Sequence, residues 1–232
     1  MKPRMPGEER KRSIIRAARE AFAEGGFSAT SVKDIAEAAD VSEALIYKHF
    51  PSKEALYAEV LEYGHEMVRI SRRELEALGP GTEALVLYTY YLLHVIVFDV
   101  PGRVADQRTF EKLLYRSLIG DPKFAQRHFQ TLRSYLADDF IDACFQAAAH
   151  CGDLAEIPIG FGNRMWFVHH LGMALSLCHV SGTSTFEYRT PKWQLVEHAV
   201  LFCLRGMGLT DEAIRKHFQP EKLRAFMKRV HG

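Results

Sequence analysis

The sequence predicts an all-α protein in which a small N-terminal three-helix domain precedes a larger helical domain. Apolar residues recur at helical spacing along most of the 232 residues, whereas the alternating pattern of β-strands is almost absent. Glycine and proline interrupt this pattern at helix-length intervals, most clearly at Gly79-Pro80-Gly81. Hydrophobic residues make up 47% of the chain and charged residues 25%, which is the composition of an ordinary globular protein with a sizeable core.

The first predicted helix covers about residues 9–24 and the second about 31–38. In the first helix Ile14, Ala18, Ala21 and Phe22 share one face, and Gly25-Gly26 ends the helix. At the start of the second helix, Ser31 and Asp34 resemble a capping box in which Asp replaces the more usual Glu. The capping pattern therefore supports a start of the second helix at about residue 31.

A third helix is expected to begin after Ser42, a suitable N-cap, and to end at Pro51. Ile46 and Phe50 form an inner pair at i, i+4 spacing, and Val41 extends the packed face. Ser52 can cap a fourth helix that runs over about 53–77. Two short helices with a tight polar break between them, over 31–50, have the form of a helix-turn-helix.

A helix-turn-helix makes double-stranded DNA the first candidate partner, because its second helix fits a major groove about 12 Å wide. The candidates for phosphate contacts are Tyr47, Lys48, His49 and Lys53. Ser31 also lies near a helix N-terminus, whose free N–H groups suit a phosphate. The full set of predicted DNA-binding residues is Ser31, Ser42, Glu43, Ala44, Leu45, Tyr47, Lys48, His49 and Lys53. Each would be ordinary alone on a surface, and it is their conjunction that favours DNA.

Net charge gives this prediction no support. Residues 1–53 hold 10 basic and 8 acidic side chains, a net +2, and the whole chain carries +1. Any basic surface must therefore be local, and binding must rest on a few placed contacts.

Gly79-Pro80-Gly81 marks the predicted domain boundary. It divides the chain into a DNA-binding domain over 1–53, a linking helix over 54–78 and a C-terminal domain over 79–232. Residues 84–98 are apolar nearly all round, and their length favours a buried helix over a strand. Further helices are predicted over about 104–118, 122–150, 161–181, 191–207, 210–218 and 220–230.

The N-terminal fifth of the chain, from about Arg12 to Leu61, closely resembles the TetR family of transcriptional regulators. The motifs that carry the resemblance are Ala21-Phe22, Gly26-Phe27, Thr30-Ser31-Val32, Asp34-Ile35-Ala36, Val41-Ser42, Ile46-Tyr47, His49-Phe50 and Ser52-Lys53-Glu54-Ala55-Leu56. Two positions depart from the family pattern. Asp40 stands where the turn usually has Gly, and Ala44 stands where Gly is common early in the third helix. Because Asp tolerates the left-handed conformation, the turn is expected to form.

The resemblance implies an all-α homodimer in which the last long helices form a four-helix interface. Residues 161–181 and 191–207 occupy the positions of those helices. Leu195, Ala199, Phe202 and Gly206 form a stripe along the second of them and are the predicted dimer residues. Ordinary packing within one chain would produce the same stripe.

The resemblance also implies a small-molecule ligand for the C-terminal domain, and the many aromatic residues there suggest a hydrophobic or aromatic one. The predicted lining is Tyr90, Tyr91, His94, Tyr115, Arg116, Phe145 and Phe167. His94 lies in the most apolar helix, so it has either a fixed partner or a cavity in front of it. Core packing explains the aromatic residues equally well.

Other classes of protein and of site are not indicated by the sequence. We expect no membrane span, secretory signal, disulfide framework, metal site or cofactor, and we expect a cytoplasmic location. His169 and His170 cannot easily share a metal, because adjacent helical residues point to different faces. No nucleophile–base motif or phosphate loop indicates an enzyme.

The leading hypothesis is a DNA-binding transcriptional regulator, a repressor that a small ligand releases from its operator. Two alternatives remain at this point. One is an all-α enzyme with an incidental helical bundle at its N-terminus. The other is a DNA-binding family member, including an activator, that senses no ligand.

Overall fold

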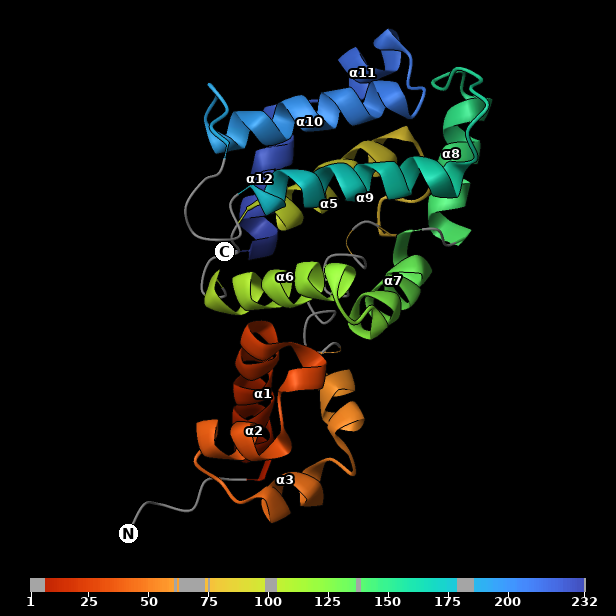
Figure 1. The fold of residues 1–232 in the computed structure, drawn as a ribbon. Helices are drawn as coiled ribbons and strands as arrows, with labels where there is room; N and C mark the ends of the chain where they lie inside the picture. Colours follow the sequence, from red (N-terminus) through yellow and green to blue (C-terminus); the bar gives the residue numbers. More distant parts are fainter. Residues whose placement is uncertain are drawn as a thin grey trace. The chain divides into compact units, whose positions relative to one another are not determined.

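The computed structural model describes residues 7–60, 62, 74, 76–98, 104–136, 139–178 and 186–231. The chain divides into two compact units (Figure 1). The first comprises Met1–Met67 and Ala105–Gln130, and the second comprises Val68–Val104 and Thr131–Gly232. Every named element is a helix, and the described residues add one isolated antiparallel bridge between Leu154 and Leu209. The all-α prediction is confirmed.

The first unit begins with α1 (Gly7–Ala29), α2 (Val32–Ala38) and α3 (Glu43–His49), followed by a helix over 53–60. Gly26 interrupts α1 with φ 79° and ψ 166°, as the Gly25-Gly26 pair predicted. Thr30 closes this end, because its hydroxyl donates to the carbonyl oxygens of Ala21 and Gly26 at 3.0 and 2.8 Å.

Aromatic rings join α1 to α6 (Val104–Ile119) and to the first part of α7 (Lys123–Leu136). Phe22 meets Tyr57 edge-on with the ring centroids 4.8 Å apart. Tyr57 in turn lies 5.0 Å from Phe124, and Phe124 lies 5.4 Å from Phe110. Residues 105–130 therefore belong to the same compact unit as the helix-turn-helix, although the predicted domain boundary put them in the C-terminal domain.

The predicted linking helix over 54–78 is described only in part. The helix over 53–60 begins as expected, since Ser52 Oγ accepts the backbone N–H of Ala55 at 3.1 Å. Residues 61, 63–73 and 75 lie outside the described residues.

In the second unit α5 (Thr82–Val97) is the central helix. It packs against α8 (Asp139–His150), α9 (Phe161–Leu177), α10 (Lys192–Gly206), α11 (Asp211–His217) and α12 (Pro220–His231) (Figure 1). Nearly all of α5 from Thr82 to Leu93 is buried, which explains why its sequence is apolar on every side. The hydroxyl of buried Thr89 donates to the carbonyl of Leu85 at 2.8 Å.

The region over 122–150, predicted as one helix, contains two helices in the structure. These are α7 and α8, and the two residues between them lie outside the described residues. Of the helices that are described, none has the length and apolar character required to cross a bilayer.

Candidate DNA-binding site

The start of α2 is fixed by a complete capping box. The side chain of Ser31 accepts the N–H of Asp34 at 3.1 Å, and Asp34 Oδ2 accepts the N–H of Ser31 at 2.8 Å. These hydrogen bonds, first the one from the backbone of Ser31, hold the pKa of Asp34 below its usual value. Ser31 itself is exposed, so it lies at a helix N-terminus that solvent or a phosphate can reach.

The turn between α2 and α3 contains the one non-glycine residue with positive φ in the described chain, Asp40, at 52°. The N–H groups of Asp40 and Val41 donate to Glu37 and Ala36 at 3.2 and 3.0 Å. A short acidic side chain thus replaces Gly at the left-handed position and the tight turn still forms, as predicted.

Helix α3 presents two different faces. Its inner side consists of the buried Ile46 and Phe50, and its N-terminus is capped by Ser42, whose Oγ accepts the N–H of Leu45 at 3.2 Å. On the outer side Tyr47 is 50% exposed. Ser42, Glu43, Ala44 and Lys48 are also exposed, and Leu45 and His49 are half-buried. The structure therefore orients α3 as a recognition helix requires, with one anchored face and one polar face.

Lysines around this face have partners that the sequence did not reveal. The Nζ of Lys53 lies 4.4 Å from the centre of the Phe27 ring, which is a cation–π contact. Lys11 pairs with Glu59 at 3.1 Å and so ties α1 to the helix over 53–60.

Lys33, which the sequence pattern did not single out, is exposed in the first turn of α2 close to Ser31. Its position beside the capping serine is the signal that could have identified it as a candidate phosphate contact.

The predicted ligand-binding residues occupy different environments. Tyr90 and Tyr91 are buried in α5, and His94 is half-buried with its ring 6.0 Å from Tyr90 and 4.6 Å from Phe98. Phe145 is buried and stacks on Phe161 at 4.7 Å, whereas Phe167 is 59% exposed. Tyr115 and Arg116 belong to the first unit, and Arg116 lines a pocket there.

The predicted dimer stripe on α10 has two parts. Leu195 and Ala199 are buried within the unit, whereas Phe202 is 71% exposed and Gly206 is also exposed. On α9, which packs against α10, Phe167 and Leu177 are exposed as well.

Across the described part of the chain, no three His, Cys, Asp or Glu side chains cluster in a way that could hold a metal ion.

Comparison with known proteins agrees with this geometry. The family model described as bacterial regulatory proteins, tetR family, matches residues 14–60, which span most of α1, then α2, α3 and the following helix. The HTH-type transcriptional regulator AcrR of Shigella flexneri is 29% identical over 166 residues, covering 70% of this chain and 74% of that protein. The HTH-type transcriptional repressor Rv3405c of Mycobacterium tuberculosis is 38% identical over 71 residues, which cover 30% of this chain and only 38% of the relative.

The likeness extends beyond the helix-turn-helix at the level of the fold. The transcriptional regulator FadR from Bacillus subtilis, solved in complex with stearoyl-CoA, superposes with a TM-score of 0.59 at 18% identity. The superposition covers 84% of this chain and 98% of FadR. FadR thus shares the fold of this chain, and the family match over residues 14–60 together with the curated relatives shows that the chain is a helix-turn-helix transcriptional regulator whose DNA-binding region is that of the tetR family of bacterial regulatory proteins.

Proposed function

We propose that the protein is a sequence-specific repressor that binds a palindromic operator as a homodimer and leaves it when a small hydrophobic ligand binds. The observation that carries the proposal is the two-faced α3 helix. Ile46 and Phe50 are buried and fix its angle, while Tyr47 and Lys48 extend from the opposite side. A helix held in this way can enter a major groove with those side chains toward the DNA.

A homodimer would account for the exposed apolar residues of the second unit. Phe167 and Leu177 on α9 and Phe202 on α10 lie on two helices that pack together (Figure 1). A two-fold dimer would cover these side chains and set two α3 helices about one DNA turn apart, roughly 34–36 Å. As a regulator of bacterial genes, the dimer would act in the cytoplasm.

The proposed ligand is supported by the chemistry of the second unit and by one structural relative. Tyr90, Tyr91 and Phe145 supply aromatic surface around the central helix α5. FadR, which shares the fold, was solved with stearoyl-CoA, a ligand with a long apolar chain. Ligand binding would change operator affinity through a coupling free energy, typically about 1–3 kcal/mol.

The test is operator binding by Tyr47→Ala and Lys48→Ala, measured on DNA from upstream of the protein's own gene at several salt concentrations. Each substitution removes a contact to DNA, so affinity should fall about tenfold or more while the dimer persists. Lys48→Ala should also reduce the slope of log affinity against log salt by about one.

Lys228→Ala serves as the matched control, because Lys228 is an exposed lysine on α12. Its operator affinity should equal that of the unmodified protein. If Tyr47→Ala and Lys48→Ala both keep that affinity too, α3 is not the recognition helix. A regulator that activates transcription would bind the operator in the same way but raise transcription of the adjacent gene, which a reporter assay distinguishes.

A further inference from the structure

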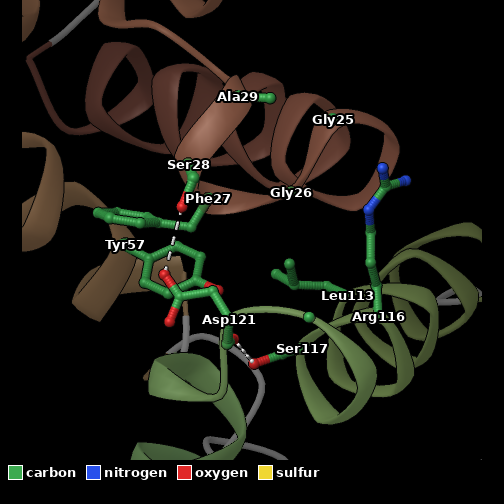
Figure 2. Close-up of a pocket in the computed structure, with 11 residues that line it drawn as sticks. Gly25, Gly26, Phe27, Ser28, Ala29, Tyr57, Leu113, Arg116, Ser117 and Asp121 are labelled. Atoms are coloured by element: carbon green, nitrogen blue, oxygen red, sulfur yellow. Dashed lines mark hydrogen bonds between the residues drawn. The ribbon is translucent and has the colours of Figure 1, made fainter.

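A pocket of about 190 Å³ lies wholly within the first unit, between the end of α1 and the end of α6 (Figure 2). Residues 25–29 form one wall, and α6 with the turn that follows it forms the other. Tyr57, from the helix over 53–60, also contributes to the lining. The pocket therefore touches three elements of the DNA-binding unit. The ligand proposed above concerns residues mainly of the second unit, so this is a different site.

Two opposite charges lie at separate places around this pocket. Figure 2 shows Arg116 beside the end of α1 and Asp121 on the other side, below Ser28. The guanidinium of Arg116 donates to the carbonyl oxygen of Glu24. Its Nε is 3.4 Å from the position that a Cβ on Gly26 would occupy, so glycine leaves room for the arginine. A guanidinium has five N–H donors, and this backbone contact uses one of them.

The carboxylate of Asp121 is held in place by its neighbours. Its Oδ1 accepts the backbone N–H of Lys123 at 3.2 Å, and its Oδ2 accepts the hydroxyl of Ser28 at 3.4 Å. The Ser117 hydroxyl donates to the backbone oxygen of Asp121 at 2.7 Å and accepts the N–H of Ala125 at 3.0 Å. The Nζ of Lys123 lies 4.0 Å from Oδ2, so a cation is already near this carboxylate. The anionic group is thus held at the pocket and retains acceptor capacity for a ligand, since a carboxylate has about four acceptor sites.

Apolar side chains form part of the remaining lining. Leu113 and Tyr57 are buried, and the ring of Phe27 lies 4.6 Å from that of Tyr57. Burial, and after it the charge of Asp121, raises the pKa of Tyr57, so its hydroxyl stays protonated. For scale, an apolar cavity of about 150 Å³ holds a benzene molecule. This pocket has room for an apolar group of that size together with a charged head.

We propose that this pocket binds a small zwitterion with an apolar side chain, the chemistry of a branched or aromatic amino acid. The carboxylate of the ligand pairs with Arg116, its ammonium group pairs with Asp121, and its side chain covers Leu113 and Tyr57. A zwitterion satisfies both charges at once, whereas a simple acid or amine pairs with one of them and lies near a like charge at the other. Because the bound molecule would contact α1, α6 and the helix over 53–60, it would hold these elements together.

The test is calorimetric titration of the full-length protein without DNA, using L-leucine, 4-methylpentanoate and isoamylamine. The last two lack the amino group and the carboxylate of leucine, respectively. Leucine should bind, and each analogue should bind about tenfold more weakly or worse. Failure of leucine and of L-phenylalanine to bind at millimolar concentration would overturn the proposal. Equal affinity for leucine and either analogue would contradict the claim that the pocket requires both charged groups of the ligand.

Two conservative substitutions locate the binding site. Arg116→Gln removes the positive charge but keeps an amide donor for the Glu24 carbonyl, and Asp121→Asn removes the negative charge but can still accept the N–H of Lys123. Each should weaken leucine binding about tenfold, and Arg127→Gln, at an exposed arginine of α7, should not. Unchanged binding in both variants would place the ligand elsewhere. Since no DNA is present, these results are independent of the operator test above.

Discussion

The backbone of Gly26 adopts a conformation that other residues rarely take. Its φ of 79° and ψ of 166° lie in a region that is essentially confined to glycine. At this point α1 breaks, Thr30 can fold back on the helix end, and Arg116 can pass close to the chain. Gly26→Ala should therefore destabilise the first unit by about 1–3 kcal/mol. Hydrogen exchange of the α1–α3 amides measures this directly, without assuming that the two units unfold together.

Gly7→Ala is the matched control for this substitution. Gly7 is also in α1, and a Cβ built there has no atom within 4 Å. Alanine should leave the stability unchanged or raise it by up to about 1 kcal/mol, because it is the better helix former. If the α1–α3 amides of both variants showed the same protection from exchange, alanine would be tolerated at position 26 without strain.

The helix α9 contains a histidine that should make the protein sensitive to acid. His169 is 4% exposed, and burial, followed by the nearby His170, lowers its pKa from 6.5 to about 3. Between these two values the unfolded chain binds a proton that the folded chain does not, so stability falls as the pH drops below 6.5. From pH 7 to pH 5 the free energy of unfolding should decrease by about 2 kcal/mol through this residue.

His169→Gln should remove this part of the pH dependence, whatever its effect at pH 7. The quantity to measure is the change in the urea midpoint of unfolding between pH 7 and pH 5. His150→Gln, at an exposed histidine that ends α8, should keep the full change. A His169→Gln protein that lost as much stability as the unmodified one would show that His169 is not the residue responsible.

At the scale of the helices, sequence patterns predicted where a helix starts better than which other helices it packs against. The serines at 31, 42 and 52 each accept the expected N–H group, because capping is a local property of three or four residues. The association of Phe110 and Phe124 with Tyr57 joins positions more than fifty residues apart, and no spacing rule reports such contacts. For this reason the sequence predicts a boundary at Gly79-Pro80-Gly81, whereas one compact unit also contains residues 105–130.

The candidate sites show the same limit. The buried and exposed faces of α3 followed from the Ile46–Phe50 spacing, but the contact of Lys53 with the Phe27 ring did not. Arg116 was predicted as a ligand-binding residue together with residues of α5, whereas the pocket it lines contains Asp121 and the end of α1. On α10, a stripe shows that residues share a face and not what covers them: Leu195 is buried within the unit and Phe202 is not.

At the scale of the whole molecule, large apolar side chains of α9 and α10 are exposed on the single chain. Phe167 on α9 and Phe202 on α10 are both more than half exposed, and these two helices pack together. Large apolar side chains that are exposed on a single chain are candidates for an interface. In a two-fold dimer each such residue is buried twice, once in each copy. Operator binding would depend on this interface, because one α3 helix alone reads only half of a palindrome.

Phe202→Glu should therefore separate the dimer into monomers. Burial of a phenylalanine contributes about 1.5–3 kcal/mol, and the substitution occurs in both copies, so the dissociation constant of the dimer should rise roughly 100-fold or more. Sedimentation equilibrium measures this, and operator affinity should fall with it. Ile119→Glu places the same charge at a side chain that is 90% exposed in the first unit and should leave the dimer intact. A Phe202→Glu protein that sedimented as a dimer with unchanged affinity would show that the protein associates through a surface other than α9 and α10.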